Sequence, residues 1–96
     1  MPTFTRHQIA EILEIDEGFL IRLETEEILF ADVTSREAPY SERMLERARV
    51  AYSLSEELEV NLPGVAVIVR LREELGTSRA RIEALVRALR GQSQRP

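Results

Sequence analysis

The run Asn-Leu-Pro-Gly at positions 61–64, which precedes a Val-rich segment, constrains the fold more than any other feature of this chain. A strand over residues 60–71 would need a buried sheet to join, and the rest of the chain offers at most a hairpin of strand. A helix is better supported, because Asn61 can cap it and Pro63 fits its first turn, where a missing N–H costs nothing. The apolar residues at helical spacing are Val65, Ile68, Val69 and Leu75. The sequence therefore predicts a buried helix over residues 62–75.

Two short amphipathic segments lie near the N-terminus. Thr5 can cap a first helix, whose apolar positions are Ile9, Ile12 and Leu13. After a break around Ile15, Asp16 can cap a second helix, and Glu17 in its first turn suits the helix dipole. One face of that second helix carries Phe19, Leu20 and Leu23. Two short helices joined by a tight turn predict a helix-turn-helix.

The middle of the chain changes character. Ile28, Phe30 and Val33 roughly alternate with polar residues before a polar stretch and Pro39, which indicates a short extended excursion, a wing or a loop. Ser41 can then cap a longer amphipathic helix.

Gly76 is expected to end or kink the helix over 62–75, and Thr77 or Ser78 offers a new cap. The segment that follows has apolar residues at i, i+3, i+4 and i+7, namely Ile82, Leu85, Val86 and Leu89. So narrow a stripe is typical of a helix that packs on a partner helix, in the same chain or in another. Arginines surround the stripe. We expect them to flank the packing surface with their charged groups in water, and the alternative is that they form a nucleic-acid-binding patch.

These patterns predict one all-α domain over residues 1–96. A helix-turn-helix with a reduced wing occupies residues 4–40, and a helical core occupies residues 41–75. A C-terminal packing or dimerisation helix occupies residues 77–91.

The residues that most catalytic or metal sites require are scarce. There is no cysteine, so disulfides, thiolate catalysis and zinc–thiolate sites are excluded. His7 is the only histidine, and the four glycines are isolated, so no phosphate-binding loop is formed. We expect no catalytic residue, no metal, no cofactor and no enzymatic activity. The chain also shows no secretory signal and no run of apolar residues long enough for a membrane span, which predicts a cytoplasmic protein.

Charge is distributed unevenly. Residues 1–33 hold two arginines against eight acidic residues, whereas the whole chain has a net charge of −4. Binding to DNA requires several cations that neutralise phosphates, and an acidic recognition helix would be repelled by a duplex. The same surface suits a cationic protein partner, although a merely solvated acidic surface is the alternative. The candidate partner-binding residues are Asp16, Glu17, Glu24, Glu26 and Glu27.

The order of these elements resembles a MerR-type winged helix-turn-helix and, more closely, the CbpM family of chaperone-modulatory proteins, over roughly residues 4–90. The most specific likeness is the helix start with its preceding leucines, which stands here as Leu54, Leu58, Pro63, Gly64, Val65 and Ala66. In MerR-type DNA-binding proteins the equivalent stretch typically resembles LRYYEREGLL, whereas this chain has LIRLETEEIL at residues 20–29. Ile21 therefore replaces an arginine and Glu27 replaces a glycine.

The resemblance implies a small, all-helical, dimeric protein that binds the J-domain of a DnaJ-like co-chaperone such as CbpA. Binding there would inhibit the co-chaperone by blocking access to the partner chaperone DnaK. The alternative function is that of a MerR-type DNA-binding transcriptional regulator. No membrane is implied as a partner.

Overall fold

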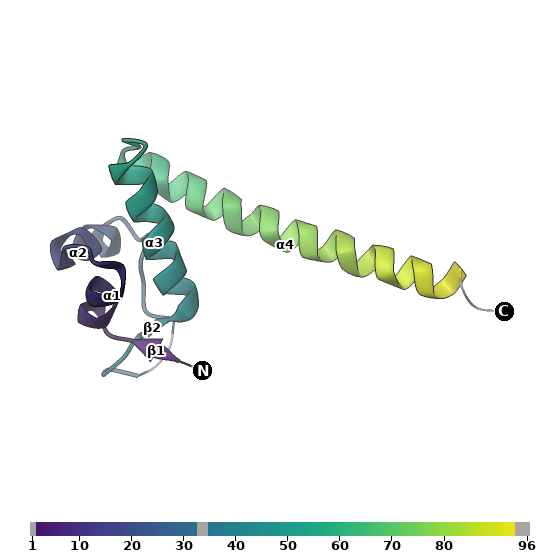
Figure 1. Ribbon diagram of the computed structural model, residues 1–96, viewed down its shortest axis with the longest axis horizontal. Coiled ribbons are helices and arrows are strands. Elements are labelled where there is room, and N and C mark those ends of the chain that lie inside the picture. Colours follow the sequence, from purple (N-terminus) through teal and green to yellow (C-terminus); the bar gives the residue numbers. More distant parts are fainter. Residues whose placement is uncertain (1, 33–34, 94–96) are drawn as a thin grey trace.

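The computed structural model describes residues 2–32 and 35–93. The elements in chain order are β1 (Thr3–Phe4), α1 (Arg6–Leu13), α2 (Glu17–Thr25), β2 (Tyr40–Ser41), α3 (Glu42–Glu56) and α4 (Leu62–Ser93). The first three helices and the two short strands form a compact head, and α4 starts against α3 and then projects from the head as a long arm (Figure 1). The predicted all-α class with a helix-turn-helix is confirmed.

The predicted caps of the helix-turn-helix are confirmed. Thr5 accepts a hydrogen bond from the amide of Gln8 at 3.0 Å, and the Gln8 side chain accepts one from the Thr5 amide at 2.8 Å, which completes a capping box. Asp16 accepts from the amide of Gly18 at 3.3 Å at the start of α2. Between the two helices, Glu14 adopts the left-handed conformation with φ of 56°, which turns the chain from α1 into α2.

The core lies where α1, α2, α3 and the first turns of α4 meet. Its fully buried large side chains are Ile9, Leu20, Leu23, Ile28, Leu29, Met44 and Val65. The ring of Phe19 packs edge-on against Tyr52, with 5.4 Å between the ring centroids. Such a core joins all the elements of the head with aliphatic side chains and few aromatic ones.

The predicted excursion after α2 is a loop, which is one of the two predicted alternatives, but Ile28 and Phe30 do not lie on one buried side of a strand. Ile28 and its neighbour Leu29 are both buried, because their amides fold back and donate to the carbonyl of Leu23 at 2.8 and 3.1 Å. Residues 28–32 thus leave α2 as a turn and a loop, and Val33 lies outside the described residues. The two-residue strands pair elsewhere, since Thr3 and Phe4 of β1 lie antiparallel to Ser41 and Tyr40 of β2.

The caps of the last two helices are also confirmed. Ser41 accepts from the amide of Met44 at 3.3 Å at the start of α3. Asn61 accepts from the amide of Gly64 at 2.9 Å at the start of α4. A Cβ at Gly64 would lie 2.9 Å from Cγ1 of Val60 and 3.2 Å from Oδ1 of Asn61, which explains why glycine stands in this first turn.

The predicted break at Gly76 is wrong, because α4 is one continuous helix of 32 residues. A glycine inside a helix costs only about 1 kcal/mol relative to alanine, which the flanking turns outweigh. Thr77 does not start a new helix; its hydroxyl donates to the carbonyl of Glu73 at 3.1 Å, one turn back in the same helix. In the part of the chain that the structure describes, no helix combines the length with the apolar character that crossing a bilayer requires.

The expectation of a buried helix over residues 62–75 holds only for its beginning. Val65 and Val69 are buried against α3, but Ile68 and Leu75 are 38 % and 53 % exposed. Ile68 lies on a different side of the helix from the buried Val65 and Val69, whereas Leu75 lies further along α4, which projects from the head (Figure 1).

Candidate functional site

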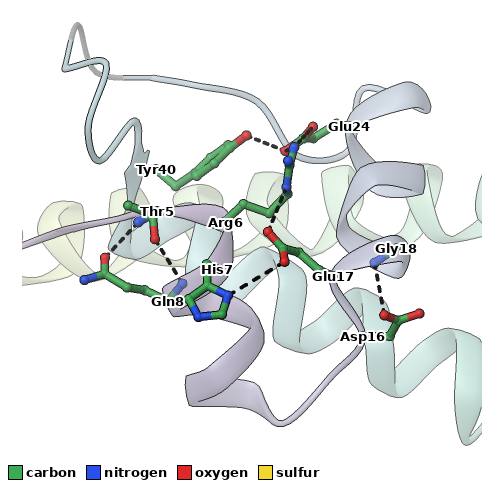
Figure 2. Close-up of polar contacts among 9 residues, drawn as sticks. All are labelled: Thr5, Arg6, His7, Gln8, Asp16, Glu17, Gly18, Glu24 and Tyr40. Carbon is green, nitrogen blue, oxygen red and sulfur yellow. Dashed lines mark hydrogen bonds and ion pairs between the residues drawn. The ribbon is translucent and has the colours of Figure 1, made fainter.

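An ion-pair cluster centred on Arg6 joins α1 to the recognition helix α2. The Arg6 guanidinium lies between two carboxylates, with Nη1 3.1 Å from Oε2 of Glu24 and Nε 3.4 Å from Oε1 of Glu17 (Figure 2). The carboxylate of Glu24 raises the pKa of Arg6 above its ordinary value, so the guanidinium stays charged. The only cation of α1 is thereby compensated within the chain by two acids of α2.

Tyr40 of β2 extends this cluster. Its hydroxyl donates a short hydrogen bond to Oε1 of Glu24, which Figure 2 shows on the side of Glu24 next to Arg6. Burial of the ring raises the pKa of Tyr40 to about 12, and the hydrogen bond to Glu24 adds to this effect. Glu24 thus links three elements, α1, α2 and β2, and it is held by both a cation and a neutral donor.

His7 lies at the exposed edge of the same cluster. Its Nε2 is 3.0 Å from Oε1 of Glu11 and its Nδ1 is 3.7 Å from Oε2 of Glu17. These contacts are ion pairs only when the imidazole is protonated. With two acidic neighbours and high exposure, His7 is a surface residue of the head.

The predicted partner-binding residues do not form one uniform surface. Glu17 and Glu24 are half-buried and already paired with Arg6, whereas Asp16 caps α2. Glu26 and Glu27 are exposed in the turn after α2, beside a groove whose other walls come from α3 and α4 and include Arg47, Ala66 and Arg70. The sequence could not separate these roles, because all five acids lie in or next to one short helix.

Glu27 has the backbone conformation of a glycine. Its φ is 58°, in the left-handed region where a side chain is unfavourable by roughly 1 kcal/mol. This is also the position at which the MerR-type resemblance expects a glycine. The turn geometry is therefore retained, and a glutamate occupies a backbone conformation that favours glycine.

The outward surface of α2 has an apolar centre. Phe19, Leu20 and Leu23 are buried, and Ile21, on the opposite side of the helix, is 46 % exposed. Arg22 lies at the edge of this surface, with its guanidinium 5.4 Å from the centroid of the Phe19 ring.

A second cluster fixes the direction of the arm. Arg47 of α3 is nearly buried and its Nε lies 3.1 Å from Oε2 of Glu73 in α4, while its Nη2 contacts Oε1 of the same carboxylate. Its Nη1 donates to the carbonyl of Ile28 at 3.0 Å, and the guanidinium lies 5.3 Å from the Phe30 ring centroid. Arg47 therefore holds the loop after α2, the helix α3 and the arm together.

The arm carries an apolar seam on the side largely opposite its contact with α3. Its residues alternate at spacings of three and four, and they are Ile68, Leu71, Leu75, Ile82, Leu85 and Leu89, with Ser78 in the one polar position. We call this set the seam. All six apolar members are exposed, from 38 % at Ile68 to 62 % at Leu85. Val86, the one member of the predicted packing stripe that is not part of the seam, lies beside it and is 41 % exposed.

Among the residues that the structure describes, none covers the predicted packing stripe of Ile82, Leu85, Val86 and Leu89. It continues backward through Leu75, Leu71 and Ile68, of which Ile68 and Leu75 were predicted to be buried. A seven-residue repeat over three heptads is the pattern of a two-stranded coiled coil. That repeat was visible in the sequence, but the assumed break at Gly76 divided it.

The likeness of this chain to known proteins agrees with the geometry. A family model described as MerR HTH family regulatory protein matches residues 4–87, which include the three helices of the head and most of the arm. Comparisons with curated proteins and with solved structures found no match. From the capped helix-turn-helix through the glycine-like turn at Glu27 to the projecting helix, the chain belongs to the MerR HTH family of regulatory proteins.

Proposed function

We propose that this chain is a protein-binding regulator that binds the J-domain of a DnaJ- or CbpA-type co-chaperone and inhibits it by blocking access to DnaK. The resemblance to the CbpM family suggests the partner, and the charge of the head supports a cationic one. The observation that carries the proposal is the position of Arg6 between Glu17 and Glu24. This pairing compensates the arginine of α1 and leaves Arg22 as the one arginine within α2.

The electrostatics of the head favour a protein partner over a duplex. Within residues 1–33 only Arg6 and Arg22 oppose eight acids. Because Arg6 is compensated by its two carboxylates, Arg22 is the one arginine within residues 1–33 that remains to release counterions from phosphates. Acidic groups close to a cationic protein surface accelerate association and disfavour wrong partners.

The proposed regulator is a homodimer that pairs through the seam of α4. An isolated helix that leaves six large apolar residues in water is unfavourable, because each would gain about 1.5–3 kcal/mol from full burial. A second copy of the chain supplies an identical seam. Closed two-fold dimers are also the commonest assemblies of soluble proteins. Such a dimer would present two heads.

A DNA-binding transcriptional regulator is the second candidate function. The match to the MerR HTH family favours it, since the helix-turn-helix is a frame that commonly places a recognition helix in the major groove. Ile21 and Glu27 disfavour DNA binding, because neither side chain can contact a phosphate favourably.

Calorimetric titration with the J-domain of a DnaJ-type co-chaperone from the same organism tests the proposal. We expect saturable binding of the wild-type chain at about 150 mM salt, and no shift of duplex DNA in a gel at that salt concentration. Absence of binding to the J-domain, together with salt-sensitive binding to an operator fragment, would favour the second candidate.

A charge-reversal pair sharpens this test. The double variant Glu26→Arg, Glu27→Arg should weaken J-domain binding at least about tenfold, because it places cations against a cationic surface. The matched control is Glu57→Arg, Glu59→Arg in the connection between α3 and α4, which changes the net charge equally at exposed positions. Equal losses for both double variants would mean that only the overall charge matters and that Glu26 and Glu27 are not contact residues.

A further inference from the structure

Ile21 lies at the centre of the outward surface of the recognition helix. Residues three and four positions away are its neighbours on a helix, and these are Glu17, Gly18, Glu24 and Thr25. At about 100° per residue, Ile21 points away from the buried side formed by Phe19, Leu20 and Leu23. An apolar side chain thus occupies the position from which a helix-turn-helix protein touches its ligand.

The two flanks of Ile21 differ. On one side Glu17 and Glu24 hold Arg6, so that this flank carries one net negative charge. On the other side Gly18 has no side chain, and the Thr25 hydroxyl donates to the carbonyl of Ile21 at 3.1 Å within its own helix. The second flank is therefore low next to Ile21, which leaves room for a partner side chain, and Arg22 borders it with its guanidinium 5.4 Å from the Phe19 ring centroid.

Exposed large apolar residues also occur at Ile12, Phe30 and Leu58, none of which lies on the recognition helix. The ring of Phe30 is covered on one face by Arg47. Ile12 of α1 is 53 % exposed but does not lie on the recognition helix. A half-exposed apolar residue encircled by polar groups is the arrangement of an interface anchor, which gains its energy when a partner excludes water from it.

We propose that this surface, Ile21 with Glu17, Gly18, Glu24 and Thr25 around it, docks a cationic amphipathic helix whose apolar residue packs on Ile21. This deepens the proposed function and rests on it for the identity of the partner. The occupant follows from complementarity: its apolar residue meets Ile21, and its lysines or arginines face the acidic flank and the remaining acids of the head. Duplex DNA presents neither a protruding apolar side chain nor positive charge to this surface.

The experiment measures the affinity of two ligands for the full-length chain and for two variants. The ligands are the J-domain of the DnaJ-type co-chaperone and a synthetic Lys-flanked, Leu-centred helical peptide. The variants are Ile21→Arg and the control Ile12→Arg, which places the same charge at the other exposed isoleucine of the helix-turn-helix. Circular dichroism and thermal melting establish that both variants are folded, and Ile21→Ala replaces Ile21→Arg if the latter is not.

We expect Ile21→Arg to weaken binding of either ligand at least about tenfold, and Ile12→Arg to change it less than about threefold. If the J-domain does not bind but the peptide binds and depends on Ile21, the docking surface stands and the proposed function is wrong. If the J-domain binds and Ile21→Arg leaves its affinity unchanged, the proposed function stands and the docking surface is wrong. Failure of both ligands to bind, or tighter binding of duplex DNA by the wild-type chain, overturns both.

Discussion

Arg47 of α3 and Glu73 of α4 form a two-point contact at the place where the arm leaves the head. Arg43 adds a third bond, 3.0 Å from Nη2 to Oε1 of the same carboxylate. Hydrogen bonds donated by Arg47 are the largest cause that lowers the pKa of Glu73 below its ordinary value, and Arg43 acts in the same direction against the effect of burial. These three bonds tie α4 to α3 at the junction between the arm and the head.

The first prediction concerns this contact. Glu73→Gln keeps the shape of the side chain but leaves the nearly buried Arg47 without its counter-charge, which should lower the free energy of unfolding by about 1–3 kcal/mol. The control is Glu46→Gln, which removes exposed ion pairs with Arg49 at 2.6 Å and with Arg72 at 3.6 Å and should change the stability much less. Urea unfolding followed by circular dichroism at one fixed protein concentration measures both. Similar losses in the two variants would show that the contact does not stabilise the junction.

The second prediction concerns Tyr40, whose pKa burial raises to about 12. Because the folded chain holds this proton more tightly than the unfolded chain, with a pKa of about 10, the associated stability is complete below pH ~10. It should decline as the pH rises from there toward about 12. The chain contains no tryptophan and only two tyrosines, so Tyr52→Phe isolates Tyr40 for a titration of phenolate absorbance. A midpoint near 10 in the folded variant would contradict the buried contact with Glu24.

The local features of this fold could be predicted from the sequence and the long-range ones could not. Caps at Thr5, Asp16, Ser41 and Asn61 depend on hydrogen bonds to amides two or three residues away, so their residue types were sufficient. The bonds from Arg6 to Glu24 and from Arg47 to Glu73 span 18 and 26 residues. No spacing rule relates such residues, since their proximity depends on how the helices pack.

The error at Gly76 has a different cause. Glycine often follows the end of a helix, but its penalty inside one is only about 1 kcal/mol, so a long helix passes through it. Taking Gly76 as an end also divided the seam, and Ile68 and Leu75 were assigned to the core. Helical spacing reveals that a residue is on an apolar side of a helix, but it does not reveal whether the same chain or a second copy covers that side.

The third prediction follows from the left-handed backbone at Glu27. Glu27→Gly should raise the free energy of unfolding by about 0.5–1 kcal/mol, because glycine adopts this conformation without steric cost. At the neighbouring position Glu26, where φ is −86°, the same substitution should not stabilise and serves as the control. If Glu27 contacts the partner, Glu27→Gly should also weaken binding of the J-domain. A gain in stability at both positions would indicate that the removal of negative charge, not the backbone, is responsible.

The fourth prediction compares two glycines of α4. Gly76 has no atom within 4 Å of an added Cβ, so Gly76→Ala should stabilise the chain by about 0.5–1 kcal/mol through the better helix propensity of alanine. Gly64→Ala should instead destabilise it, because the new Cβ would lie 2.9 Å from Val60 in the first turn. Thermal melting of the two variants beside the wild type measures the opposite shifts. A rise for Gly64→Ala would mean that Val60 can move aside and that the Pro-Gly start of α4 is not required by sterics.

The last prediction tests the seam. Leu85→Asp places a charge in the seam, whereas Ala84→Asp places the same charge on the adjacent residue, which faces largely away from it. The cost in helix propensity is at most about 0.7 kcal/mol for either variant and is slightly larger for Ala84→Asp, so loss of the dimer in Leu85→Asp alone reports on pairing of the arms. Sedimentation equilibrium should find a dimer for the wild type and for Ala84→Asp, and a monomer for Leu85→Asp at the same concentration, because burying an unpaired carboxylate opposes association strongly. The head should stay folded in all three, since it buries its core without the outer half of α4. A wild-type monomer at high concentration, or a dimer that survives Leu85→Asp, would show that the exposed apolar residues of the arm are covered in some other way.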